Sequence, residues 1–433
     1  IMVGQTTVPL VGIVDVVVIG RTGDAAALAG VALGATVVNF LFWSFGFLRM
    51  GMTGMTAQAK GAGDEAEMRA MLARGLVAGL MIGTVLFALQ WLLIPAALRL
   101  FAGGGALDSA TRGYVSARFL GAPASLAVFA INGWLLGLGR TRPALLLQIV
   151  MSCVNGALDI AFVWGMGMGA HGVGLGTACA EWVALATGLA IALRILGPQA
   201  VGRMRAERGR IADAAAMRRL FAVNADIMIR TVALLALFAW FANAGARLGA
   251  VQLAANHVLM QFVSVAAFVL DGFAFTAEAR VGQAIGARSR TQLVRAIRLT
   301  GEFSLVSGMG FAAAIVLAGG VLVDAMADNA AIHATARTLI PYVALVPLLG
   351  VPAWLLDGIF IGATAGKALR NAAVLATMLY IGTDLALRPL GPGGVWIALL
   401  ASYVYRAAAL GVALPGLLSA LPRTPLAQGA RDS

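Results

Sequence analysis

Two acidic residues lie where a membrane-spanning helix should carry no charge. Asp15 lies within the apolar run VPLVGIVDVVVIG, and Asp159 lies within the run SCVNGALDIAFVW. A carboxylate at membrane depth costs roughly 3 kcal/mol and usually marks an ion or proton pathway. Asn155 precedes Asp159 by four residues and shares its helix face, and Thr177 adds a hydroxyl from the next apolar run. If they meet in space, these oxygen atoms suit Na⁺ or H⁺, so we predict a cation or proton site.

A proline precedes the first of these acids. Pro9 lies six residues before Asp15 within the same apolar run. Proline inside a helix frees a backbone carbonyl and favours a bend. A bent helix with an acid at its middle can move when that acid changes charge, so we predict a hinge at Pro9.

The second half of the chain also carries charged residues in or near apolar runs. Asp271, Arg280 and Asp357 are predicted to take part in coupling or in substrate binding. For Arg280, an ion pair at the membrane interface is the alternative interpretation. Met50 and Met52 lie in the run MGMTGM, and flexible thioethers suit a pocket for varied apolar ligands, although most Met residues pack cores.

Composition indicates an all-α integral membrane protein. Of 433 residues, 61% are hydrophobic and 12% are charged, and the mean hydropathy is +0.91. The net charge of +12 comes from Arg near helix ends, which orients a chain in the bilayer, so we expect no nucleic-acid partner. The chain has no P-loop, no HExxH and no metal-ligand spacing, so we expect no enzymatic activity, no cofactor and no metal beyond Na⁺ at the cation site.

Apolar runs between polar breaks predict twelve transmembrane helices. The expected limits are 1–20, 26–57, 72–101, 109–138, 144–165, 173–197, 221–245, 251–278, 299–321, 331–361, 369–387 and 394–420. Because the sequence begins at Ile1 inside an apolar run, we expect part of the first helix to precede it.

The distribution of basic residues predicts the orientation of these helices. One set of loops and helix ends carries 20 Lys and Arg residues, and the opposite set carries 6. Basic residues are enriched on the cytoplasmic side. We therefore expect both termini in the cytoplasm, which agrees with an even number of spans.

The two halves of the sequence resemble each other. The run NGWLLGLGRTR (132–142) matches DGIFIGATAGK (357–367) at an offset of 225 residues, and the same offset carries Asp159 onto Asp384. We predict two pseudo-symmetric six-helix lobes, 1–197 and 221–433, joined by a basic cytoplasmic linker, 198–220. Parallel repeats of this kind are typical of alternating-access carriers.

The ordered set of these features resembles the multidrug and toxic compound extrusion (MATE) transporters over essentially the whole chain. The runs LDGFAFTAEARVGQAIGAR (270–288) and LDGIFIGAT (356–364), followed by Arg370 and Asn371, are similar to stretches of the DinF-like branch. The resemblance implies a V-shaped antiporter that exports amphipathic, often cationic, compounds in exchange for H⁺ or Na⁺. It also implies that the oxygen set of the first lobe is the cation site.

Three other functions are the alternatives. A flippase for lipid-linked oligosaccharides would favour a large cationic cavity, a membrane-embedded enzyme would need clustered catalytic residues, and a channel would not need duplicated lobes. We expect a monomer in the inner membrane of a bacterium, with membrane lipid and small substrates as its partners.

Overall fold

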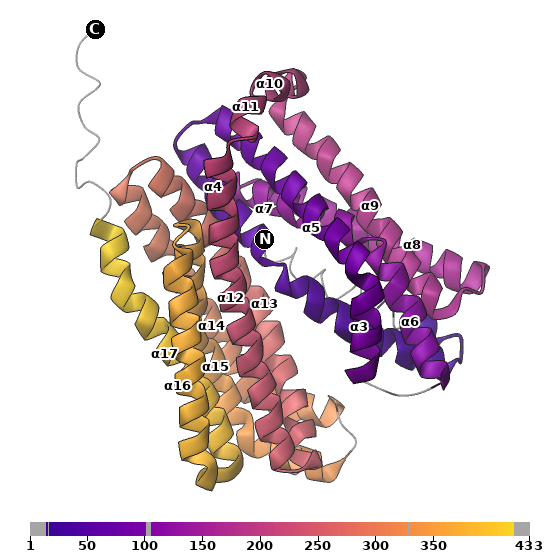
Figure 1. Cartoon of the computed structure of the whole chain (residues 1–433). Helices are drawn as coiled ribbons and strands as arrows, with labels where there is room; N and C mark the ends of the chain where they lie inside the picture. Colours follow the sequence, from indigo (N-terminus) through magenta and orange to yellow (C-terminus); the bar gives the residue numbers. More distant parts are fainter. Residues whose placement is uncertain (1–13, 16, 101–104, 327–328, 420–433) are drawn as a thin grey trace.

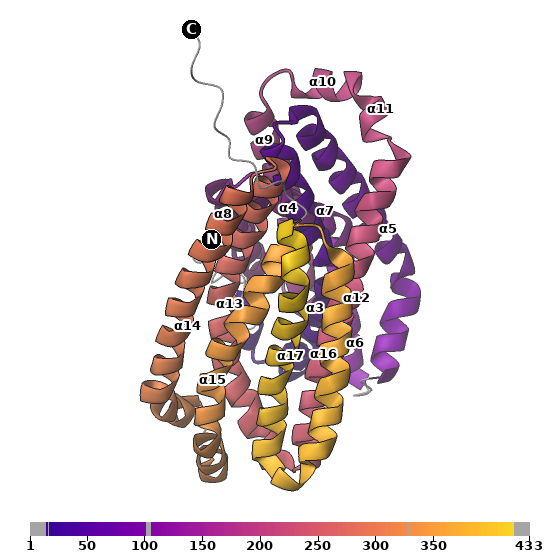
Figure 2. The ribbon, with the colours of Figure 1, turned by 90° about the vertical axis from the view of Figure 1, so that its left-hand side faces the viewer.

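The computed structural model describes residues 14–15, 17–100, 105–326 and 329–419, and the regular structure in these ranges is helical (Figures 1 and 2). The first half contains α3 (Ala25–Ser44), α4 (Phe47–Gly61), α5 (Glu65–Leu100), α6 (Gly105–Phe119), α7 (Ala122–Gly137), α8 (Thr141–Asp159), η1 (Ile160–Gly165) and α9 (Gly169–Leu196). Two short helices follow, α10 (Ala200–Ala206) and α11 (Arg208–Ile211). The second half contains α12 (Ala214–Arg247), α13 (Ala250–Gly286), α14 (Arg290–Met326), α15 (Ala330–Gly362), α16 (Gly366–Leu387), η2 (Arg388–Leu390) and α17 (Gly391–Ser419). We call the first half, with residues 14–20, the N lobe and α12–α17 the C lobe.

The helices are consistent with twelve spans in an integral membrane protein. By length and composition, nine helical stretches of the described residues can cross a membrane, or ten when the bent pair α6–α7 counts as one span. One stretch, Gly366–Ser419, contains both α16 and α17, which pack against each other and therefore supply two spans. The first predicted span, 1–20, lies mostly outside the described residues.

Several helices differ from the predicted limits. The predicted span 109–138 bends by 52° between α6 and α7, where Pro123 favours the start of a new helix. The predicted span 26–57 is interrupted between α3 and α4. Helix α12 begins at Ala214, inside the predicted linker, because Asp213 caps its first turn by accepting a hydrogen bond from the Ala215 N–H.

The two lobes contact each other through α4 and α7 of the N lobe and α12, α13 and α15 of the C lobe. Small residues allow the close approach of α4 and α13. A Cβ atom on Gly282 would lie 2.6 Å from the Cβ of Ala57, and one on Gly286 would overlap the backbone carbonyl of Gln58. These residues lie in the last turns of α4 and α13, and α5, which begins directly after α4, contacts α10 and α11.

The segment α10–α11 is attached to the N lobe. Arg69 donates two hydrogen bonds to Glu207, at 3.0 and 2.6 Å. Arg74, whose side chain is 1% exposed, donates to the backbone carbonyls of Arg210 and Ile211. Arg210 in turn pairs with Asp64 at 2.9 Å. The linker is therefore a docked element of the first lobe.

Candidate functional site

Three of the predicted N-lobe residues form a hydrogen-bonded group. Asn155 and Asp159 project from one face of α8 and are 0% exposed. The Asn155 amide donates to Asp159 Oδ2 at 3.2 Å and to Thr177 Oγ1 on α9 at 3.0 Å. The Thr177 hydroxyl donates to the Val173 carbonyl at 3.0 Å, which orients its oxygen toward Asn155.

The close approach of α8 and α9 depends on the backbone around these residues. Gly176 precedes Thr177, and any side chain at position 176 would overlap Asp159 Oδ1. Directly after Asp159 the helix widens into the π-helical segment η1. Such segments occur mostly as local insertions and are frequent at functional sites.

Asp15 belongs to the same group. Its carboxyl group is buried and interacts with the side chains of Asp159 and Asn155. The helical turn that follows is fixed to η1, because the Trp164 indole donates to the Val18 carbonyl at 3.0 Å. We call Asp15, Asn155, Asp159 and Thr177 the N-lobe polar cluster.

The N-lobe polar cluster contains buried oxygen atoms with free acceptor capacity. Oδ1 of Asp15, Oδ1 of Asp159 and Oδ1 of Asn155 receive no hydrogen bond from any described residue. Buried polar atoms in folded proteins are nearly always satisfied. Two carboxyl groups, an amide oxygen and a hydroxyl can accept a proton or coordinate a hard monovalent cation.

An ion pair beside the cluster was not predicted from the sequence. Arg118 on α6 lies 3.0 Å from Glu181 on α9, and both side chains are buried. Gly121 makes room for the Glu181 carboxylate. Arg118 also interacts with Asp15 over a longer distance. The available signal in the sequence was that Arg118 and Glu181 have opposite charges and that each lies well inside an apolar run.

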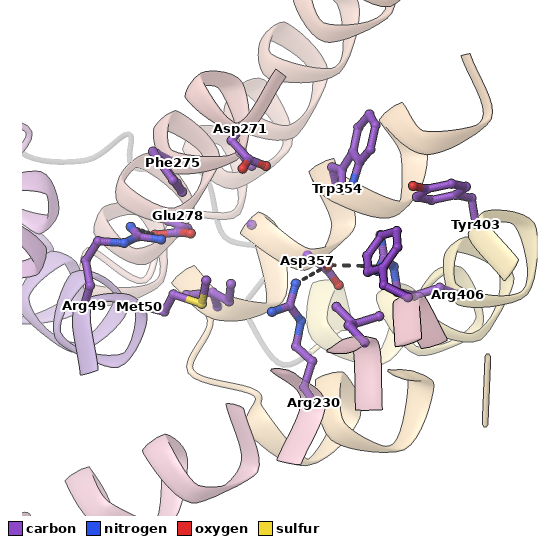
Figure 3. Close-up of a pocket in the computed structure, with 15 residues that line it drawn as sticks. Arg49, Met50, Arg230, Asp271, Phe275, Glu278, Trp354, Asp357, Tyr403 and Arg406 are labelled. Carbon is purple, nitrogen blue, oxygen red and sulfur yellow. Dashed lines mark hydrogen bonds and ion pairs between the residues drawn. The ribbon is translucent and has the colours of Figure 1, made fainter. Parts of the chain in front are cut away.

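A second polar region lies where α4 meets the C lobe. A cavity of about 200 Å³ is lined by residues of α4, α12, α13, α15 and α17 (Figure 3). Its charged lining consists of Arg49, Arg230, Arg406, Asp271, Glu278 and Asp357. We call it the C-lobe cavity.

Ion pairs connect most of these charges. Arg230 donates to Asp357 Oδ2 at 2.5 Å, and Arg406 Nε lies 3.8 Å from the same oxygen. Arg49 reaches across from the N lobe and lies 3.5 Å from Glu278 and 4.0 Å above the Phe275 ring centroid.

The predicted substrate or coupling residues separate into three groups. Asp271, Asp357 and Met50 line the C-lobe cavity. Met52 does not, because its side chain is 0% exposed and packs where α4 meets Gly75 and Gly133. Arg280 is exposed and lines a different hollow, of about 700 Å³, between α13 and α14.

The remaining predicted residue, the Pro9 hinge, lies outside the described residues. Three further residues that line the C-lobe cavity, Arg230, Glu278 and Arg406, were not predicted from the sequence as site residues. The signal for Arg406 was a single arginine within the apolar run of the last span.

Comparison with known proteins gives consistent matches. The family model MatE matches residues 1–161 and 227–385. DNA damage-inducible protein F of Escherichia coli K12 is 37% identical over 393 residues, which cover 91% of this chain and 85% of that protein. Multidrug resistance protein PmpM of Pseudomonas aeruginosa is 26% identical over 420 residues, covering 92% of this chain and 86% of the relative.

Solved structures share the fold. A crystal structure described as MATE in the bent conformation superimposes with a TM-score of 0.84 at 18% identity, covering 97% of this chain and 93% of the other. A structure described as an outward-facing conformation of a multidrug resistance MATE family transporter gives a TM-score of 0.80 at 19% identity, covering 98% and 94%.

Proposed function

Because the chain belongs to the MatE family, we propose that it is a multidrug transporter that exports small amphipathic compounds by alternating access, in exchange for H⁺ or Na⁺. It is an integral membrane protein and a transporter rather than an enzyme. Relatives named multidrug resistance proteins, NorM of Vibrio vulnificus and PmpM, support drug efflux as the activity.

The N-lobe polar cluster is the single observation that supports ion coupling. Asp15 and Asp159 are buried next to each other, and the amide that donates to Asp159 is neutral. Two ionised carboxylates in a dry site repel each other and lose hydration. A proton or Na⁺ removes both penalties, so occupancy of the cluster changes the preferred arrangement of the first span.

The C-lobe cavity is the proposed substrate site. It lies at the contact between the lobes, where α4 meets α12, α13 and α15. Ion and substrate then favour different states of the same carrier, which is what coupling requires. We propose that the first span bends near Pro9 when the cluster fills, and that this displaces the substrate.

The proposed orientation rests on the distribution of basic residues. The end that carries α10 and α11 has the larger set of basic residues, so we place it and both termini in the cytoplasm of a bacterium. The close contacts of Gly282 and Gly286 lie toward this end. The cytoplasmic side is therefore the closed side of this conformation, and the inner membrane is the proposed location of a monomeric carrier.

Transport in proteoliposomes tests the proposal. Purified protein is reconstituted into vesicles that are loaded with a fluorescent dye such as ethidium. A pH gradient and a Na⁺ gradient are then imposed in separate experiments. We expect dye movement with one gradient and its loss in Asp15→Asn. Gradient-driven movement that persists in Asp15→Asn would remove Asp15 from the coupling mechanism, and no movement with either gradient would reject the antiport.

A further inference from the structure

Three arginines and three acids line the C-lobe cavity, but several of the arginine N–H groups donate no hydrogen bond to those acids. One carboxylate, Asp357, serves two guanidinium groups, from Arg230 on α12 and Arg406 on α17. All three side chains are buried. This trio carries a net charge of +1, because both arginines are protonated and only one carboxylate lies between them.

Hydrogen bonds within the trio are also incomplete. Nε of Arg230 and both Nε and Nη2 of Arg406 are buried, and no described residue accepts a hydrogen bond from them. Arg406 is 6% exposed and Arg230 is 8% exposed. Buried N–H groups are almost always paired in folded proteins, so these donors indicate a ligand that supplies acceptor atoms.

The other charges of the C-lobe cavity do not supply those acceptors. Glu278 is held by Arg49 at 3.5 Å. Asp271 lies on the α13 side, away from Arg406 and Arg230 (Figure 3). Asp271 interacts with both arginines electrostatically, but among the described residues no ion pair or hydrogen bond joins it to either of them, so their free N–H groups remain available.

Aromatic side chains form much of the remaining lining. Phe238, Phe275, Trp354 and Tyr403 contribute rings, and the Trp354 and Tyr403 rings meet edge to face with centroids 5.4 Å apart. A cavity of about 150 Å³ accepts one benzene molecule. At about 200 Å³, the C-lobe cavity accepts one ring system of slightly larger size.

On the basis of the proposed export function, we propose that the C-lobe cavity binds a small aromatic substrate through a carboxylate or sulfonate group held by Arg406 and Arg230. The planar guanidinium fork of Arg406 matches a two-oxygen anion, and its Nε and Nη2 are the two unpaired donors. The aromatic body packs against the ring side chains. The transported compounds therefore include ones with an anionic group.

A matched series of ligands tests this substrate class in the unmodified protein. Naphthalene-2-carboxylate, naphthalene-2-carboxamide and 2-naphthylmethylammonium have the same ring system and differ in charge. Binding is measured by isothermal titration calorimetry in lipid nanodiscs, with empty nanodiscs as the blank. We expect the carboxylate to bind about tenfold more tightly than the amide, since bonds between charged groups are the stronger ones. Equal affinities, or tighter binding of the ammonium compound, would overturn the proposal.

Variants identify the residue that provides the preference. We expect Arg406→Gln to abolish the preference for the carboxylate, and Arg406→Lys to retain part of it, because the charge remains and the fork is lost. The control is Arg247→Gln, which removes a guanidinium that pairs with Asp384 on the same lobe and does not line the cavity. The control should keep the preference, and an Arg406→Gln protein that also keeps it contradicts the assignment.

The dye assay separates this inference from the proposed function. If the unmodified protein exports ethidium but shows no preference for the carboxylate, the anion subsite is wrong and the exporter stands. If it binds the carboxylate but moves neither ethidium nor the carboxylate under either gradient, the subsite stands and ion-driven export is wrong. Because the ligand series needs only the unmodified protein, a variant that fails to fold leaves the test intact.

Discussion

Asp159 in the N-lobe polar cluster and Asp357 in the C-lobe cavity have different kinds of hydrogen-bond partners. In the N-lobe polar cluster, Asp159 accepts a hydrogen bond from a neutral amide, and the adjacent Arg118 is occupied by Glu181. In the C-lobe cavity, Asp357 accepts a hydrogen bond from Arg230 at 2.5 Å. An acid with a fixed positive partner is already neutralised, whereas an acid without one is available to a mobile cation. This difference supports the proposal that ion and substrate bind at separate sites in the two lobes.

The related sequences of the lobes make the difference more informative. Asp384 lies 225 residues after Asp159. Asp384 accepts hydrogen bonds from Arg247 at 2.8 Å and from the Trp240 indole at 2.9 Å. Trp240 in turn lies 225 residues after Asp15. At matched positions, the N lobe has a second carboxyl group and the C lobe has an indole donor. Asp384 therefore has fixed partners where the proposed ion site has a second acid.

Replacing the C-lobe acid should produce the largest effect on stability. In Asp357→Asn, the guanidinium groups of Arg230 and Arg406 lose their shared anion while remaining buried. Breaking a buried pair in this way costs about 3–5 kcal/mol. Asp159→Asn should be neutral or stabilising, because its hydrogen-bond donor is uncharged. The measurement is the thermal unfolding midpoint by intrinsic fluorescence in detergent.

The control for this stability comparison is Asp324→Asn. Its partner Arg337 is more than half exposed, so we expect a loss below about 1 kcal/mol. Equal losses of stability in Asp357→Asn and Asp159→Asn would show that the charged donor of Asp357 and the neutral donor of Asp159 do not make these acids different.

The second prediction concerns transport. We expect Asp159→Asn to reduce gradient-driven dye export by roughly 5- to 150-fold, the usual range of a coupling free energy. Asp384→Asn, at the matched position of the C lobe, should keep its dependence on the gradient, because Arg247 already neutralises this acid. Initial rates in proteoliposomes with matched protein content provide the measurement. Gradient dependence lost in Asp384→Asn and kept in Asp159→Asn would reverse the assignment of the lobes.

A smaller stability effect is expected at Asp384 itself. The variant Asp384→Asn leaves Arg247 without its carboxylate, but that guanidinium is 33% exposed and can turn to water or lipid headgroups. We expect a loss of about 1.5–3 kcal/mol, typical of a hydrogen bond to a charged group. Trp240→Phe, which removes only the indole donor, should lose less. A loss as large as that of Asp357→Asn would mean that exposure does not relieve the unpaired arginine.

The sequence predicted the fold and the shared helix face of Asn155 and Asp159 because both depend on local patterns, whereas the meeting of Asp15 and Thr177 with them depends on how the helices pack. Long apolar runs specify transmembrane helices, and the spacing of Asn155 and Asp159 specifies one face. The sequence analysis did not predict the bend between α6 and α7, although Pro123 was an available local signal. The space that Gly121 leaves for Glu181 and Ala178 of α9 becomes visible only once the helices are packed. It also did not predict that several helices continue beyond the apolar runs, since polar residues at a helix end do not interrupt the backbone hydrogen bonds.

The C-lobe cavity was predicted only in part, for a related reason. Arg49 and Glu278 are 229 residues apart, and pairing at that separation depends on how the lobes dock. Met50 and Met52 look alike in the sequence, yet residues two apart on a helix face different sides, so Met50 lines the cavity and Met52 packs in the core. Charges inside apolar runs signal that a partner exists, but only the packing of helices identifies it.

The smallest predicted effect is a pH-dependent release of the segment α10–α11, which is attached to the N lobe through side-chain ion pairs. The Arg69 guanidinium donates to Glu207 and lowers the pKa of that carboxyl below its ordinary value of 4.5. The backbone N–H of Glu67, together with Arg210, lowers the pKa of Asp64 below 3.8. A carboxyl group with a lowered pKa stabilises the docked state above its ordinary pKa, and this contribution is lost as the pH falls through the lowered value.

A spin label tests this pH dependence. A side-chain carbon added at Gly209 would have no neighbouring atom within 4 Å, so Gly209→Cys, with Cys153 and Cys179 replaced, can carry the label without disturbing the linker. We expect constant mobility from about pH 7 to about pH 4.5 and increased mobility below about pH 4. Glu207→Gln should already be more mobile near neutral pH and respond less to acid. Mobility that rises between about pH 7 and about pH 5, or a Glu207→Gln protein that matches the parent, would show that these ion pairs do not hold the linker on the N lobe.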